Sequence, residues 1–301
     1  MLALKNPRIA IPVVLFAGIL WSFGAPVVRY MDDPHLVPWQ YIFGRGVTIF
    51  ILLNLYLYFE EGINFYKNYF KIGLSGIIGG SGLGIAMITF IYSITNTSAA
   101  ITLLCLAAMP FFTALLAFLF LKERISLNVW ISIIIASFGM IIMGIGSNEQ
   151  NSLIGFIFGI TSSIGFSIFS VTLRWRKETP KFTTVAFAGF FCIIFSIIII
   201  LSNDLVFFST SYNSSMFSLH GTLVCIGLIL YSIGSKAIPA AELTLLSLTE
   251  VIGGIFWVWL PILGINEVPS TNTIIGGFFL FISLTYYSLI MRWNKRYIGL
   301  N

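Results

Sequence analysis

Two charged side chains lie well inside apolar stretches of this sequence, and they are its best candidates for chemistry. Glu250 falls near the middle of the apolar run 240–262. If that run crosses a lipid bilayer, a charge at this depth costs about 2.5–3.5 kcal/mol on insertion scales. Such a group usually faces a polar cavity, where it can bind an ion, a proton or a substrate. The alternative is a protonated Glu250 that is hydrogen-bonded to a neighbouring helix.

Arg45 is the second such charge, and it lies in the apolar run 37–59 between Gly44 and Gly46. The two glycines let another helix or a ligand come close to the guanidinium. Two interpretations remain open. Arg45 pairs with Glu250 as a structural or gating ion pair, or it holds the carboxylate of a substrate while Glu250 meets the cationic end of the same molecule.

Aromatic side chains accompany these charges, and rings inside a cavity can hold an amine by cation–π contact. The competing interpretation is a belt of aromatic residues at the membrane surface, which fits Trp39, Trp175 and Trp293 better. The aromatic residues predicted to contribute to a substrate site are Trp21, Tyr41, Tyr92 and Trp257.

The sequence offers little for metal, redox or nucleotide chemistry, so we predict no cofactor and no metal site. Cys105, Cys192 and Cys225 fall in apolar runs and match no metal or redox spacing, which favours small buried hydrophobes. The two histidines, His35 and His220, are predicted near the outer face. The sequence contains no phosphate-binding loop, and an enzyme embedded in the membrane is a remote alternative.

Long apolar segments must position these residues. Only 9% of residues are charged and mean hydropathy is +0.98, whereas a soluble domain carries about 25% charged residues. Ten segments come near the roughly 20 residues that cross a bilayer, and they should be helical because lipid offers backbone groups no partners. We predict an all-α integral membrane protein with ten transmembrane helices, at 9–29, 37–59, 72–94, 98–120, 127–146, 153–174, 183–202, 219–236, 240–262 and 272–291.

Nearly all of the 16 basic residues lie on one side of this predicted topology. When alternate loops are assigned to opposite sides, only Arg29 lies on the other side, and Arg45 lies within a span. Because Lys and Arg near span ends favour the cytoplasm, both termini are predicted to be cytoplasmic, in the cytoplasmic (inner) membrane of a bacterium. The apolar run after Lys5 and Arg8 is interpreted as a retained span rather than a signal peptide. The basic residues are flanking anchors, so no nucleic acid partner is expected.

The two halves of the sequence resemble each other. Ala99–Ala100 and Ala240–Ala241 each open an apolar run with an irregular centre, and Glu123 and Glu267 each follow the end of one. Self-similarity of this kind indicates a repeated structural unit. The chain is therefore predicted to consist of two repeats of five spans each.

Five is an odd number, so the second repeat (148–301) must enter the membrane upside down relative to the first (1–147). Inverted repeats in transporters place the substrate site near the midplane, at weakened helices in matching positions. Pro110 removes a backbone hydrogen bond near the centre of the fourth span, and Gly253–Gly254 lies near the centre of the ninth. These residues are predicted to interrupt the helices and to act in gating; bending for packing alone is the alternative.

Several of these features together resemble the drug/metabolite transporter superfamily, with two tandem EamA-type domains. They are the ten spans, the duplicated half, Pro110 followed by Lys122–Arg124, and the motif Glu267–Ser270. The sequence departs from the family pattern at Glu250–Val251, where a Pro is common. The resemblance implies a proton- or gradient-coupled carrier that works by alternating access around a central cavity.

The two buried charges and the resemblance predict a secondary transporter of a small polar metabolite, such as an amino acid, an amine or another zwitterion. Coupling would come from a proton gradient or from exchange, and the chain would act as a monomer or a homodimer. The main alternative is an exporter of drug-like or toxic metabolites with broad specificity. A channel is disfavoured because two isolated charges do not line a pore repetitively.

Overall fold

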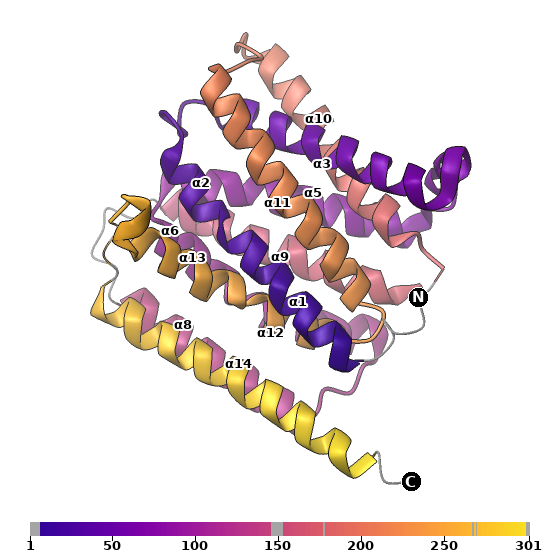
Figure 1. Cartoon of the computed structure of the whole chain (residues 1–301), viewed down its shortest axis with the longest axis vertical. Helices are drawn as coiled ribbons and strands as arrows, with labels where there is room; N and C mark the ends of the chain where they lie inside the picture. Colours follow the sequence, from indigo (N-terminus) through magenta and orange to yellow (C-terminus); the bar gives the residue numbers. More distant parts are fainter. Residues whose placement is uncertain (1–6, 146–152, 177, 267, 269, 299–301) are drawn as a thin grey trace.

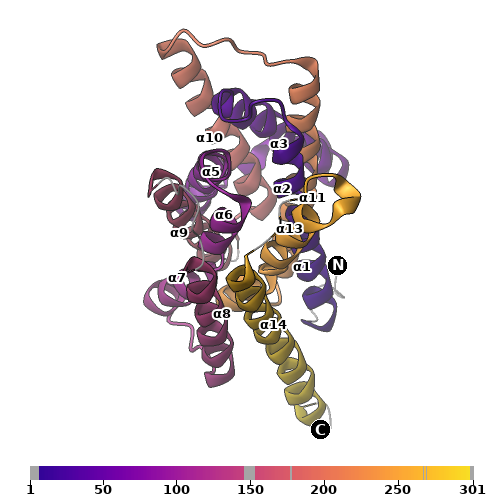
Figure 2. The same ribbon diagram turned by 90° about the vertical axis from the view of Figure 1, so that its left-hand side faces the viewer.

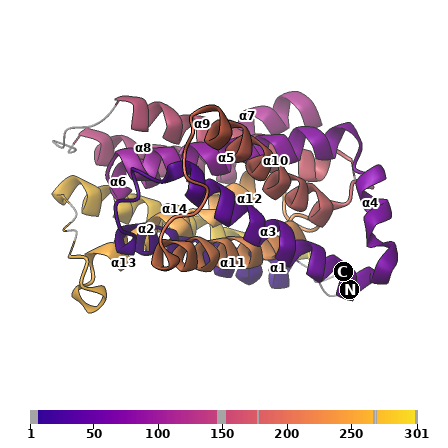
Figure 3. The same cartoon turned by 90° about the horizontal axis from the view of Figure 1, so that it is seen from above.

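The computed structural model describes residues 7–145, 153–176, 178–266, 268 and 270–298, and within these ranges the chain forms helices and no strand. Figure 3 shows the long helices lying along one common direction. The elements are α1 (Pro7–Ser22), α2 (Gly24–Tyr30), α3 (Pro38–Glu61), η2 (Gly62–Tyr66), α4 (Lys67–Phe70), α5 (Gly73–Asn96), α6 (Ala99–Leu106), α7 (Met109–Leu116), η3 (Ala117–Leu121), α8 (Leu127–Ile145), α9 (Leu153–Trp175), α10 (Lys181–Ser202), α11 (Ser211–Gly234), α12 (Ala240–Ser247), α13 (Thr249–Trp259), η4 (Pro261–Leu263) and α14 (Thr271–Ile298).

Eight helical segments in the described part of the chain are long and apolar enough to cross a membrane. Two shorter apolar segments, Leu127–Ile142 in α8 and Ile274–Tyr287 in α14, occupy the positions of the fifth and tenth predicted spans. The chain is therefore all-helical and multi-pass. The count of ten spans and the division into two repeats stay predictions. The predicted boundary at 147/148, both chain ends and Glu267 lie outside the described residues.

The eighth predicted span is wrong at its start. The sequence suggests a polar loop over 203–218, but α11 begins at Ser211. The Thr210 hydroxyl caps this helix by accepting a hydrogen bond from the backbone N–H of Asn213 at 3.1 Å. Polar residues of this type favour helix starts as well as loops, which explains the error. His220 therefore lies in the third turn of α11, where its side chain is only 2% exposed, and not near the outer face.

The fourth span is interrupted near its middle. α6 ends at Leu106 and α7 begins at Met109, so Ala107 and Ala108 separate the two helices, and Pro110 is the second residue of α7. Proline lacks a backbone N–H, and the first turn of a helix is where that group has no partner within the helix. The interruption and the proline therefore fall at the same place.

The ninth span is interrupted at Leu248, between α12 and α13, and not at Gly253–Gly254 as the sequence suggested. α13 runs unbroken through both glycines. On either side of Leu248, the hydroxyls of Ser247 and Thr249 donate to the carbonyl oxygens three residues earlier, at 2.8 and 3.1 Å. Such local bonds compete with the helical pattern, and they place the break five residues before the predicted position.

The long helices pack in pairs that join distant parts of the sequence. α5 packs along α9, α1 along α11, α3 along α10 and α8 along α14; Figure 1 shows the α8–α14 pair at one edge of the bundle. In the α5–α9 contact, a Cβ on Gly82 would lie 3.0 Å from the carbonyl oxygen of Gly165. The two backbones thus touch, as small residues allow at helix contacts in membranes.

One end of the bundle is tied together by Arg174, near the end of α9. Its Nε donates to Glu123 Oε1 at 2.8 Å, and its Nη1 donates to the carbonyl oxygens of Ser235 and Ile238 at 3.1 and 2.8 Å. Lys181 Nζ also donates to Ser235 Oγ at 2.8 Å. The Arg174–Glu123 pair connects the predicted second repeat with the first, and the other bonds tie helices of the second repeat together, at the end predicted to face the cytoplasm.

We expect Arg174→Ala to lower the free energy of unfolding by about 1–3 kcal/mol, because it removes an ion pair and two hydrogen bonds from a charged donor. Thermal unfolding of the purified protein in detergent measures the change. Arg176→Ala is the matched control, since Arg176 is exposed two residues further along, and its loss should cost below about 1 kcal/mol. Equal destabilisation by the two variants would contradict the assignment.

Candidate functional site

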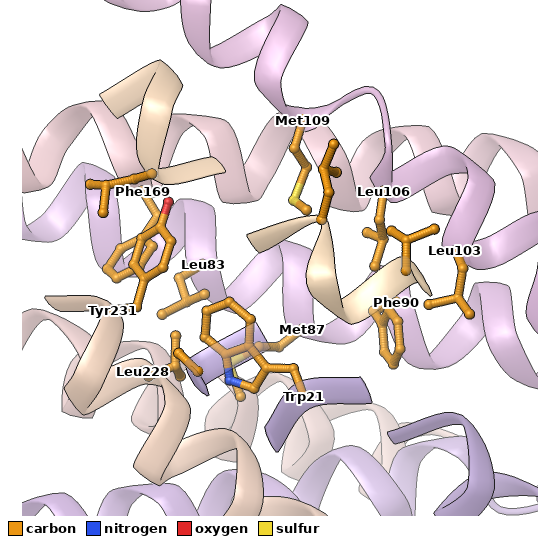
Figure 4. Packing of buried hydrophobic residues seen from close by; sticks show 14 of the residues in the cluster. Trp21, Leu83, Met87, Phe90, Leu103, Leu106, Met109, Phe169, Leu228 and Tyr231 are labelled. Atoms are coloured by element: carbon orange, nitrogen blue, oxygen red, sulfur yellow. The ribbon is translucent and has the colours of Figure 1, made fainter. Parts of the chain in front are cut away.

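A cavity lies between the helices, and both predicted buried charges line it. Figure 2 shows α5, α6 and α9 on one side of the bundle and α1, α11 and α13 on the other. In Figure 4 the side chain of Trp21, from α1, lies near those of Met87 and Phe90, which both come from α5. The lining residues are Trp21, Arg45, Leu83, Ala86, Met87, Phe90, Leu106, Met109, Ser162, Phe166, His220, Val224, Leu228 and Glu250.

Arg45 enters the cavity wall from α3 and is only 2% exposed. Its Nη2 donates a hydrogen bond to the carbonyl oxygen of Met87 at 2.7 Å. Its Cζ lies 6.0 Å from the ring centres of both Tyr41 and Phe90, within cation–π range. Its Nε is buried and has no hydrogen-bond partner among the described residues. The guanidinium is thus held in place while part of its hydrogen-bonding capacity is unused.

Glu250 is the second residue of α13, directly after the interruption at Leu248. Its carboxylate therefore lies in the first turn of a helix, where the helix dipole favours negative charge. Within the part of the chain that the structure describes, no salt bridge joins Glu250 to Arg45, although the two side chains interact electrostatically. The direct ion pair between Arg45 and Glu250, which is the first of the two interpretations, is therefore absent in this conformation. The interpretation in which a substrate bridges the two charges stays a prediction.

Trp21 is the one of the four predicted aromatic residues that lines the cavity. Its Nε1 donates to the carbonyl oxygen of Val224 at 3.3 Å, and its ring meets Phe166 edge-on at 5.5 Å. These contacts fix the indole against α9 and α11. Tyr41 lies directly behind the cavity wall, where its hydroxyl is hydrogen-bonded to Nδ1 of the lining residue His220.

Tyr92 and Trp257 are not brought to the cavity. The Tyr92 ring packs against Trp39 at 5.4 Å and Phe158 at 5.2 Å. Trp257 stacks on Phe23 at 4.7 Å. Its Nε1 also donates to a hydroxyl at the end of α1, Ser22 Oγ, at 2.9 Å. The geometry gives these two residues packing contacts instead of a place in the cavity wall.

The predicted gating glycines are also packing positions. A Cβ on Gly253 would lie 2.7 Å from the side chain of Ser22, and one on Gly254 would lie 2.8 Å from Leu103. These distances are too short for any larger residue without movement, so the two glycines let α13 sit closely against α1 and α6. Pro110 is the neighbour of the lining residue Met109. A role in gating for all three stays a prediction.

The sequence did not predict that His220, a polar residue, lines the cavity. It also did not predict the apolar lining residues Met87, Phe90 and Phe166. His220 was missed because the start of α11 was predicted eight residues too late, at 219 instead of Ser211. One signal was available: His220, Val224 and Leu228 recur at four-residue spacing, so they share one face of a helix. The apolar residues carried no such signal, since spacing alone does not tell a cavity wall from a lipid-facing wall.

A second pocket lies at the basic end of the bundle beside the Arg174–Glu123 pair. Glu242 lines it and is hydrogen-bonded to the Tyr287 hydroxyl. This pocket is distinct from the central cavity in its lining residues. Among the residues that the structure describes, no group of three or more His, Cys, Asp or Glu side chains could hold a metal ion.

Comparison with known proteins gives one family match: residues 8–145 match the EamA-like transporter family. Two relatives, each named an uncharacterized transporter, come from Helicobacter pylori strains J99 and 26695 and are 29% and 28% identical over 171 residues. The match covers 56% of this chain and 56% of each of these relatives. An uncharacterized transporter of Clostridium kluyveri is 28% identical over 234 residues, 72% of this chain and 71% of the relative.

A solved crystal structure of another protein has the same overall fold. It aligns with a TM-score of 0.72 over 95% of this chain and 99% of the other, at 17% sequence identity. At that identity the likeness concerns the arrangement of helices alone.

We expect a cysteine at position 224 to react with a charged, water-soluble thiol reagent, because Val224 lines the cavity and the reactive thiolate forms in water. The matched control is a cysteine at Ile226, which is 42% exposed on another face of α11 and would face lipid. Both variants are made after replacing Cys105, Cys192 and Cys225 with Ser, and labelling is measured in membranes. Faster labelling at position 226 would contradict the assignment of the cavity.

Proposed function

We propose, on the premise that residues 8–145 belong to the EamA-like transporter family, that this chain is a secondary transporter of a small zwitterion such as an amino acid. The chain is a multi-pass membrane protein, and its named relatives are transporters. Substrate class, coupling and mechanism go beyond that and are the content of the proposal.

The observation that carries the proposal is one cavity with a positive and a negative group that do not pair with each other. Arg45 and Glu250 both line it, on α3 and α13, and apolar and aromatic residues fill the wall between them. Buried charges usually have partners, because leaving them unpaired is costly. A substrate with a carboxylate at one end and an amine at the other supplies both partners at once.

The packing of the helices supports alternating access between two inverted repeats. In the two predicted repeats, α1–α2 corresponds to α9, α5 to α11, and α6–α7 to α12–α13. The counterpart of the contact between α5 and α9 is then the contact between α11 and α1. The counterpart of the contact between α7 and α12 is the contact between α13 and α6. All of these contacts occur. Exchange of the halves thus reproduces the pattern of neighbours, which is expected of repeats that rock against each other around a central site.

Two further elements of the proposal concern coupling and orientation. Glu250 is the group that would carry a proton, since a carboxyl that alternates between a dry and a wet environment can alternate between its neutral and charged forms. Exchange of substrates is the alternative to proton coupling.

The basic residues around Arg174 and Lys181 would face the cytoplasm of a bacterium, as the distribution of Lys and Arg favours.

A broad-specificity exporter of drug-like molecules is the second candidate, and the composition of the cavity wall favours it. Met87, Met109, Phe90 and Phe166 line the cavity. Methionine adapts its shape to different ligands, and aromatic rings accept many apolar groups. This alternative predicts binding of lipophilic cations with no requirement for a carboxylate.

A thermal-shift screen of the purified protein against amino acids, amines and osmolytes tests the proposal, because a ligand stabilises the state that it binds. We expect at least one amino acid to raise the melting temperature. Arg45→Ala and Glu250→Gln should each weaken its binding about tenfold or more, since each leaves one charged end of the ligand unpaired. Counterflow in proteoliposomes then measures transport of the same compound.

Glu178→Gln is the matched control, because Glu178 is exposed and lies away from the cavity lining. It should bind and transport the same compound as the unmodified protein does. The proposal fails if Arg45→Ala and Glu250→Gln keep full binding and transport. Stabilisation by lipophilic cations and by no amino acid would favour the exporter.

A further inference from the structure

A tyrosine–histidine pair lies beside Arg45 in the central cavity. The Tyr41 hydroxyl and His220 Nδ1 are hydrogen-bonded to each other. The Tyr41 ring centre is 5.8 Å from the His220 ring centre and 6.0 Å from Arg45 Cζ, and the Phe90 ring lies 6.4 Å from the His220 ring and 6.0 Å from Arg45 Cζ. The imidazole and the guanidinium are thus placed around the same two rings, in the same part of the cavity.

The hydrogen bond determines which nitrogen of His220 carries the proton. Tyr41 is fully buried, and its hydroxyl has no other partner among the residues that the structure describes. If Nδ1 donated, the tyrosine O–H would be left buried without an acceptor, which is costly. The arrangement that satisfies both groups has the Tyr41 O–H donating to Nδ1. A neutral imidazole then carries its single proton on Nε2.

The neutral form is also the one that suits the surroundings. A cationic imidazole would lie close to the Arg45 guanidinium in a site shielded from water, where like charges repel strongly. The charged and titratable groups that line this cavity are Arg45, His220 and Glu250. No hydrogen-bond partner of Nε2 occurs in the described ranges, so the hydrogen-bonding capacity of this N–H is unused.

Packing holds the imidazole in this position. The Tyr41 ring stacks on Phe217 at 4.9 Å, and a Cβ on Gly44 would lie 3.1 Å from the Phe217 side chain. On the far side of the imidazole, a Cβ on Gly24 would lie 2.8 Å from His220 Nε2. Glycine at position 24 leaves the space that the edge of the imidazole occupies. The ring is therefore positioned before a ligand arrives, which reduces the cost of ordering on binding.

We infer that His220 Nε2–H and the Arg45 guanidinium together form the carboxylate subsite of this transporter, and that Tyr41 is a positioning residue that fixes the donor. The inference rests on the proposed function and adds a specificity rule to it. Two N–H donors match the two oxygens of a carboxylate. A primary amide presents one acceptor oxygen and an NH2 group, so one of the two donors would be left facing another donor. The site should therefore prefer a free carboxylate to its amide.

The test compares binding of L-amino acids with binding of the corresponding L-amino acid amides, measured by titration of the purified full chain. The unmodified protein should bind at least one amino acid about tenfold or more tightly than its amide, as sites that lose a buried hydrogen bond discriminate strongly. His220→Leu should reduce this acid-to-amide ratio about tenfold. His220→Gln keeps an N–H donor and should retain most of the ratio.

Tyr41→Phe tests the positioning role. It should lower the acid-to-amide ratio several-fold in the unmodified background and have no further effect in the His220→Gln background, because the glutamine does not depend on the tyrosine for its donor. A merely structural role for Tyr41 would lower the melting temperature equally in both backgrounds and leave the ratio unchanged. The melting temperature of each ligand-free variant separates loss of folding from loss of specificity.

The failures of this inference and of the proposed function are distinguishable. If Arg45→Ala and Glu250→Gln abolish binding while His220→Leu leaves the ratio unchanged, the transporter proposal stands and the carboxylate subsite at His220 is overturned. If amines bind and no carboxylate-bearing amino acid does, the subsite is likewise overturned. If none of the variants changes binding of any amino acid, both fail together.

Discussion

The cost of placing polar groups where no water can reach them governs this structure. In a bilayer core, each backbone N–H and C=O needs a partner inside the protein, and each charge needs a polar surrounding. Arg45 and Glu250, far apart in the sequence, meet that requirement by lining one shared cavity. The interruptions of the helices obey the same rule, because they are packed within the bundle and side-chain hydroxyls take up part of the freed hydrogen-bonding capacity at Leu248.

Close helix contacts are what bring the two charges into one cavity. Gly253 and Gly254 let α13 approach α1 and α6, and the Trp257 indole closes that contact through its bond to Ser22. Glu250 lies one turn before these glycines, so its depth and direction depend on them. Residues outside the cavity wall thus set the position of a residue inside it. This is why an aromatic residue near a buried charge in the sequence, such as Trp257, can be structural.

The sequence predicts where long apolar helices run better than it predicts which way their side chains face. Hydropathy predicted eight apolar segments that the described part of the chain forms as long helices, and it placed Arg45 and Glu250 inside two of them. It misplaced His220, since the polar start of α11 reads as a loop until the cap at Thr210 is seen. It also grouped Tyr92 with Trp21, although only Trp21 faces the cavity. Which face of a helix points inward is decided by contacts with helices distant in sequence, and a single sequence does not contain them.

The separation of the two charges is itself informative about function. A direct ion pair between Arg45 and Glu250 would satisfy both groups without a ligand, and a substrate would then have to break it in order to bind. Held apart in a partly apolar wall, the two charges do not satisfy each other, and the proposed bridging zwitterion would supply a partner to both. A carrier must also release its substrate, so it needs a site that is neither too stable when empty nor too stable when full. In a carrier with two conformations, a change in the distance between α3 and α13 would alter the fit of such a ligand at both ends simultaneously. Differential affinity of this kind is what lets a ligand shift a conformational equilibrium.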